Sequence, residues 1–169
     1  MIRTGKQDFG ALTEQAQGRE AWKRIEILLR VRDRSESELR ERLSRAGFDD
    51  AIIELQVGRA LEVGWVDDLR FARLYVSGKK RSGWGRSRIE NELKRFGIEL
   101  KLCEGYPDVY FDDDEEYDRA LACLKGFRSA AKDKYAALYR KLLSKGFSTE
   151  IISRVLSSSD YQETINRPQ

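Results

Sequence analysis

The densest run of positive charge in this 169-residue sequence lies between residues 79 and 95, which we call the basic corner. It combines seven cations with a tryptophan flanked by glycines: Lys79, Lys80, Arg81, Trp84, Arg86, Arg88, Lys94 and Arg95. Only two acids, Glu90 and Glu92, stand among them. Lys and Arg bind carboxylates and phosphates, and an exposed tryptophan beside arginines suits a protein contact or stacking on a base. The chemistry that this run predicts is binding of a negatively charged partner.

A solvated helix surface is the alternative explanation of the basic corner. Such a surface usually carries compensating acids one turn away, and two of the three turns here lack them. Lys79, Lys80 and Arg81 end one predicted helix, where cations are stabilised by the negative pole of the helix dipole. Arg86 and Arg88 begin the next helix, where cations meet the positive pole. Helix stability therefore explains the first group only, and the sequence favours a binding role for Arg86 and Arg88.

Catalytic chemistry finds little support in the sequence. There is no histidine, which excludes Ser-His, Cys-His and His-metal sites. No nucleophile elbow or phosphate loop is present, and residues 83–86 lack the remaining glycines of a dinucleotide fingerprint. Cys103 and Cys123 have no C-x-x-C spacing and are expected to fill small gaps in the core. The sequence predicts a protein that is not an enzyme and uses no metal or cofactor.

An acidic run follows in residues 112–118. It lacks the alternating oxygen ligands, central glycine and final glutamate of a calcium loop. Most of it precedes a predicted helix, whose positive N-terminal pole stabilises negative charge, and this is the favoured explanation. Electrostatic interaction within the chain or with a partner is the other.

Composition places the binding chemistry in the first half of the chain. The net charge is +3, but residues 19–98 hold 19 basic and 14 acidic side chains, whereas residues 99–169 hold 11 and 13. A negatively charged partner is therefore expected at the first half. No apolar run approaches the roughly 20 residues that cross a bilayer, and no signal peptide opens the chain. These features predict a soluble, cytoplasmic protein with no membrane partner.

The elements that position these residues are predicted to be helices in three tandem repeats. Gly47, Gly97 and Gly146 lie 50 and 49 residues apart. Each has a leucine four residues before it and an apolar residue directly after it, in the pairs Leu43 and Phe48, Leu93 and Ile98, and Leu142 and Phe147. A Schellman motif places such a glycine in the left-handed conformation and brings the two apolar side chains together. The recurrence predicts an all-α fold with positive φ at all three glycines.

Local signals give the boundaries of these repeats. We expect a flexible tail at 1–18, three-helix repeats at 19–66, 67–111 and 112–157, and a polar tail at 158–169. The first helix is expected from Arg19, Ser35 and Glu38 form a capping box, and Asp49 caps the third helix. In the second repeat, Gly105 and Pro107 interrupt the third helix, which predicts a shortened helix followed by an extended piece.

An ordered set of motifs between residues 20 and 157 resembles the RecX family. In the middle of the chain the set comprises Gly64–Asp68, Phe71, Ala72, Tyr75, Gly83, Arg88, Ile89, Leu93, Gly97 and Ile98. Before it stand Arg34–Arg40, Leu43, Gly47 and Phe48, and after it Leu142, Lys145–Phe147, Ile151 and Ile152. The order of these motifs is more specific than any one of them.

The resemblance implies three tandem three-helix repeats in an elongated, curved helical array. It also implies a monomeric, non-enzymatic regulator of the RecA recombinase, with roles in DNA recombination, DNA repair and the SOS response. Such a regulator is expected to lie in the groove of the RecA–DNA filament and to inhibit recombinase, ATPase and coprotease activities. The implied partners are the RecA filament and single- or double-stranded DNA, with the basic corner as the contact surface.

Two other functions remain open at this stage. One is a direct DNA- or RNA-binding module whose basic corner contacts phosphates, and the other is a helical scaffold for unrelated protein partners. Salt dependence separates them, because phosphate binding falls steeply with salt whereas a mixed protein interface responds less.

Overall fold

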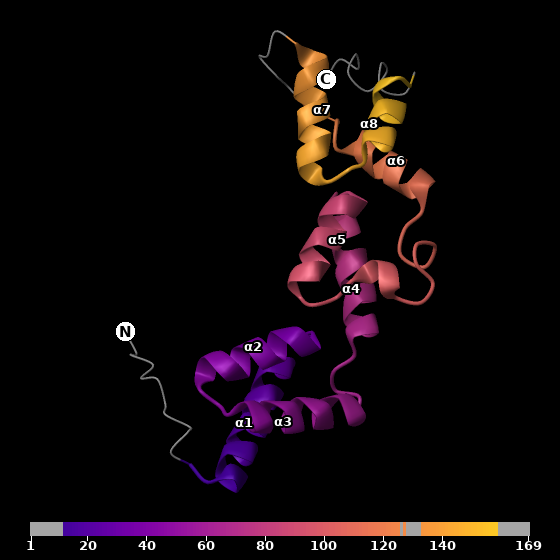
Figure 1. Ribbon diagram of the computed structural model, residues 1–169. Helices are drawn as coiled ribbons and strands as arrows, with labels where there is room; N and C mark the ends of the chain where they lie inside the picture. The colour runs from indigo at the N-terminus through magenta and orange to yellow at the C-terminus, as the bar shows by residue number, and fades with distance from the viewer. Residues whose placement is uncertain (1–11, 126, 128–132, 159–169) are drawn as a thin grey trace. The chain divides into compact units, whose positions relative to one another are not determined.

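The computed structural model describes residues 12–125, 127 and 133–158, and the regular elements in these ranges are all helices (Figure 1). The predicted all-α fold is confirmed. The helices are α1 (Glu14–Val31), α2 (Glu36–Ala46), α3 (Asp50–Glu62), α4 (Asp68–Arg81), α5 (Arg86–Arg95), α6 (Asp113–Ala122), α7 (Lys134–Lys145) and α8 (Thr149–Leu156), with a 3₁₀ turn η2 (Leu100–Leu102) after α5. Most of both predicted tails lies outside the described residues.

The chain divides into two compact units. The first contains the described residues up to Phe71 together with Phe96–Ile98, and the second contains residues 72–95 and the described residues from 99 onward. Helices α1, α2 and α3 form the first unit around a buried apolar core: Ala21, Ile25, Leu39, Leu43, Phe48, Ile52, Ile53, Val57, Ala60 and Val66. In the second unit, α6, α7 and α8 surround another: Ala120, Leu124, Leu138, Leu142, Phe147, Ile151, Ile152, Val155 and Leu156.

Helix α1 begins at Glu14, earlier than the expected start at Arg19. Thr13 caps it, because its side-chain oxygen accepts from the Ala16 amide at 3.4 Å. The extra turn is held by Gln17, which is buried and whose Nε2 donates to Asp49 Oδ2 at 2.7 Å. Asp49 stands at the N-cap of α3 as predicted, but its side chain makes no cap hydrogen bond there.

The capping box at α2 is only half formed. Ser35 Oγ accepts from the Glu38 amide at 3.2 Å, as the sequence predicts. The Glu38 side chain does not return to Ser35; it accepts from Arg34, from Arg32 Nη2 at 2.7 Å and from Arg42 Nε at 3.2 Å. Burial alone would raise the pKa of Glu38, but the hydrogen bonds from Arg32 and Arg34 outweigh burial and lower it.

The glycine repeat is confirmed. Gly47, Gly97 and Gly146 have φ of 93°, 77° and 88°. At the first and third sites the Schellman hydrogen bond is present, from Phe48 N to Leu43 O and from Phe147 N to Leu142 O, both at 3.3 Å. The leucine and the apolar residue of each of the three pairs are buried. A local signal in the sequence thus sets three helix ends.

The third helix of the second repeat is reduced to η2, which confirms the predicted shortening. The extended piece expected after it is wrong, because residues 104–110 form consecutive turns. Gly105 takes a left-handed φ of 77° and its carbonyl accepts from Val109 N at 2.8 Å. These turns bring Tyr110 and Phe111 into buried positions ahead of α6.

Candidate partner-binding site

The basic corner is built on α4, a tight turn at residues 82–85, and α5. The turn rests on the C-terminal end of α7: Gly85 N donates to Lys145 O at 2.9 Å, and Ser87 N donates to Gly146 O at 3.0 Å. A Cβ on Gly85 would lie 2.3 Å from Phe147 N, a separation that real Cβ atoms do not show. Glycine is therefore required here for the close approach of two backbones.

Trp84 does not protrude from this turn. It is half-buried, with Lys79 Nζ 4.2 Å and Arg88 Cζ 3.8 Å from its ring centroid. Cations over the face of an indole are stabilised by the ring quadrupole. The expectation of an exposed tryptophan was wrong, because α4 and α5 each supply a cation that covers the ring.

Arg86 has local partners that its position at a helix start does not reveal. Its Nε lies 2.9 Å from Glu90 Oε1, its Nη2 donates to the Tyr106 hydroxyl, and its Cζ is 5.2 Å from the Phe111 ring centroid. Burial alone would lower the pKa of Arg86, but the hydrogen bonds to Tyr106 and Glu90 raise it. Tertiary contacts that the helix-dipole argument did not include therefore give Arg86 a structural role.

The Arg86 backbone is held as well. Its amide donates to Glu116 Oε1 at 2.9 Å. Glu116 is a buried acid, and burial raises its pKa. Arg88 is also engaged, through its stacking on Trp84 and a long contact of 3.4 Å from Nη1 to Ser144 O. Both arginines thus join the corner to elements that follow it in the chain.

Three cations of the corner remain exposed. Arg81 donates to Ser77 Oγ at 2.9 Å on its own helix. Lys94 pairs with Glu99 at 3.2 Å, and Arg95 pairs with Glu92 at 3.1 Å. Such exposed pairs are weak and exchange readily with solvent or a partner. These side chains are therefore the members of the corner most accessible to an incoming anion.

The acidic run both stabilises a helix start and forms ion pairs within the chain, the two explanations that the sequence left open. Asp112 caps α6 by accepting from the Glu115 amide at 2.8 Å, and four acids follow in the first turn, where the helix dipole stabilises them. Two of these acids also form ion pairs with distant residues. Glu115 lies 2.9 Å from Lys80 Nζ, and Asp114 lies 2.7 Å from Arg154 Nη2.

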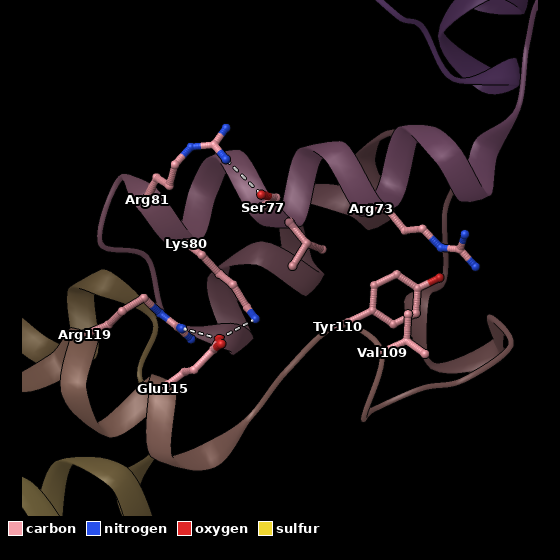
Figure 2. Close-up of a pocket in the computed structure, with 9 residues that line it drawn as sticks. Arg73, Ser77, Lys80, Arg81, Val109, Tyr110, Glu115 and Arg119 are labelled. Atoms are coloured by element: carbon pink, nitrogen blue, oxygen red, sulfur yellow. Dashed lines mark hydrogen bonds and ion pairs between the residues drawn. The ribbon is translucent and has the colours of Figure 1, made fainter.

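A groove of about 470 Å³ lies beside the corner in the second unit (Figure 2). Its lining comes from α4, the 104–111 turns and α6: Arg73, Val76, Ser77, Lys80, Arg81, Val109, Tyr110, Glu115 and Arg119. The sequence interpretation missed Arg73, Tyr110 and Arg119. Arg73, Ser77 and Arg81 are four residues apart on one helix face, a signal that could have been used. Arg119 belongs to the next repeat and only folding brings it near.

Both cysteines are free and half-buried, and Cys123 Sγ lies 3.5 Å from Gly83 O. This packing agrees with their expected role as fillers of small gaps. None of the described helices is long and apolar enough to cross a membrane.

Two family models match parts of this chain, and one of these parts includes the basic corner. Residues 67–104 match the family model described as the second three-helix domain of RecX, and residues 27–55 match the first. The regulatory protein RecX of Vibrio campbellii is 30% identical over 139 residues, which cover 79% of this chain and 87% of that protein. The chain belongs to the RecX family. The RecX of Serratia proteamaculans, 30% identical over 153 residues, covers 76% of this chain and 90% of its own length.

Solved structures agree with this membership at the level of the fold. The crystal structure of RecX from Lactobacillus salivarius superposes with a TM-score of 0.72 at 18% identity, over 84% of this chain and 96% of that one. A second structure, of a regulatory protein RecX, gives 0.71 at 20% identity over 93% of this chain and 80% of its own. The basic corner lies within the part that matches the second RecX domain.

Proposed function

We propose that this protein binds the RecA–DNA filament and inhibits the recombinase, ATPase and coprotease activities of RecA. The observation that carries this proposal is the match to regulatory proteins of the RecX family along most of the length of both chains. The RecX resemblance in the sequence implied this target, and the basic corner supplies charge suited to an acidic groove or to DNA phosphates.

The contact surface proposed for the filament is the exposed part of the corner. Arg81, Lys94 and Arg95 would meet the partner directly, because they are exposed and their contacts are weak: ion pairs for Lys94 and Arg95, and a hydrogen bond to Ser77 for Arg81. The remaining members of the proposed surface hold the corner in shape, and all of them except the neutral Trp84 also contribute positive charge: Lys79, Lys80, Trp84, Arg86 and Arg88. In this proposal the protein acts as a cytoplasmic monomer, without catalysis and without a cofactor.

The proposal is tested by DNA-dependent ATP hydrolysis by RecA from the same organism. Hydrolysis should fall as the protein is titrated, and the effect should saturate at a fixed ratio to RecA, as expected for an inhibitor that binds the filament. The protein alone should hydrolyse no ATP. An unchanged rate at equimolar protein, with filaments intact, would exclude inhibition.

A further inference from the structure

The groove beside the corner has an ion-pair arrangement that the proposed regulation does not explain. Lys80 Nζ and Arg119 Nη1 reach the same oxygen, Glu115 Oε2, at 2.9 and 3.4 Å, and Figure 2 shows them arriving from α4 and α6. The two cations are largely buried, with side-chain exposures of 21% and 15%, whereas Glu115 is 61% exposed. Two sheltered positive charges thus share one exposed negative charge.

Arg119 is poorly satisfied by this arrangement. Its Nε and Nη2 atoms are buried and find no hydrogen-bond acceptor among the described residues. A buried donor without an acceptor costs free energy, more so when the group is charged. The single contact of Arg119 with Glu115 is long, so a better acceptor in the groove would be stabilised.

Further donors extend the groove along α4. Arg81 follows Lys80 in the chain and also lines the groove, although Figure 2 shows its guanidinium directed to Ser77. Arg73 lies at the opposite end, where Figure 2 shows it near the Tyr110 ring. Seven residues separate Arg73 from Lys80, which corresponds to about 10 Å along a helix. The side chains of Val76, Val109 and Tyr110 line the space with apolar surface. The groove therefore offers two cationic ends joined by an apolar stretch.

We propose that this groove binds the phosphate backbone of single-stranded nucleic acid, and that Glu115 holds the place of one phosphate until the strand displaces it. A strand presents phosphates at intervals and can use both cationic ends, whereas a lone phosphate can use one. The volume of about 470 Å³ is that of a small-molecule site, enough for a short stretch of one strand. Displacing Glu115 costs little because a phosphate replaces it as the partner of both cations, while Glu115, already 61% exposed, returns to water. This activity needs no recombinase and goes beyond the proposed regulation.

The test is binding of a short fluorescent oligothymidylate, followed by anisotropy without RecA. Glu115→Gln removes the internal competitor and should tighten binding about fivefold, the equivalent of an exposed ion pair worth about 1 kcal/mol. Asp114→Asn is the matched control. It makes the same charge change one residue away, its side chain is 84% exposed, and its partner Arg154 does not line the groove. It should change affinity less than twofold.

A double-mutant cycle with Lys80→Gln tests whether the gain in affinity from Glu115→Gln depends on the contact between Glu115 and Lys80. This variant should bind more weakly than the wild type, and in its background Glu115→Gln should give little gain, because the shared cation is gone. Arg81→Gln, an exposed change that leaves the ion-pair cluster intact, should also weaken binding. Equal gains for Glu115→Gln and Asp114→Asn would mean that only net charge matters and would overturn the proposal. The proposal would also be overturned if Glu115→Gln gave its full gain in oligonucleotide affinity in the Lys80→Gln background. Tighter binding of polyglutamate than of the oligonucleotide would overturn it as well.

Discussion

Three arginines converge on Glu38, and one of them, Arg34, is as buried as the carboxylate itself. The pKa of Glu38 is lowered in the folded state, because hydrogen bonds from Arg32 and Arg34 outweigh the opposing effect of burial. The ionised carboxylate therefore stabilises the fold above its unfolded pKa of about 4.5, and this contribution is lost as the pH falls through the lower folded value.

We predict that Glu38→Gln lowers the free energy of unfolding at pH 7 by about 3 kcal/mol, because it leaves buried Arg34 without its counter-charge. The difference between wild type and variant should shrink as the pH falls below about 4.5, where the wild-type carboxylate also becomes protonated. Urea titrations at several pH values measure this. Glu41→Gln, at an exposed pair with Arg45, should cost less than about 1 kcal/mol. A difference that does not change with pH would contradict the assignment.

Arg86 gives a second prediction at the scale of a residue. Its ion pair with Glu90, its contact with Tyr106 and its place over Phe111 make it part of the second unit's interior. Arg86→Ala should destabilise the protein by about 1–2 kcal/mol, reduced from the buried-pair range because 29% of the side chain is exposed. Arg95→Ala, at 77% exposure, should stay within about 0.5 kcal/mol. Equal thermal melts for the two variants would place Arg86 on the surface after all.

At the scale of elements, the packing of the 82–85 turn on the end of α7 depends on Gly85. We predict that Gly85→Ala costs about 2–3 kcal/mol, because its Cβ would overlap the backbone of Gly146 and Phe147. Gly64→Ala separates this effect from conformational strain. Gly64 has φ of 71° but no atom of the described residues within 4 Å of an added Cβ, so only about 1 kcal/mol is expected. A smaller loss at Gly85 than at Gly64 in chemical denaturation would contradict the close approach.

The helix ends could be predicted from sequence because their signals are local. Ser35 and Ser148 cap the helices that follow them, and the left-handed glycines end the helices before them. Each of these interactions spans a few residues, so a spacing in the sequence is enough to reveal it.

The candidate site could be predicted only in outline. The run of cations identified the basic corner, but the covering of Trp84 depends on how α4 and α5 meet. Likewise, the placement of Arg119 beside Lys80 joins residues from two repeats through Glu115. Contacts of this kind depend on tertiary packing, for which no residue spacing gives a signal.

For the whole molecule, the proposed partner surface predicts a separation of binding from folding. Reversing Arg81, Lys94 and Arg95 to Glu should leave the thermal melt within a few degrees of wild type, because exposed charges contribute little to stability. Inhibition of RecA ATP hydrolysis should weaken by at least about tenfold in the required concentration, through lost steering and new repulsion. Reversing Arg24, Arg30 and Arg45, exposed cations of the first unit, is the matched control. Equal losses in both triple variants would assign the effect to net charge.

The most direct test of the account is co-sedimentation with RecA filaments assembled on single-stranded DNA. The protein should pellet with the filaments and saturate at a fixed ratio to RecA, well above the amount that pellets with the same DNA alone. The Arg81, Lys94 and Arg95 reversal should leave most of it in the supernatant. If filaments carry down no more protein than DNA alone at concentrations that saturate the DNA, the chain does not recognise the RecA filament, and the central claim is contradicted.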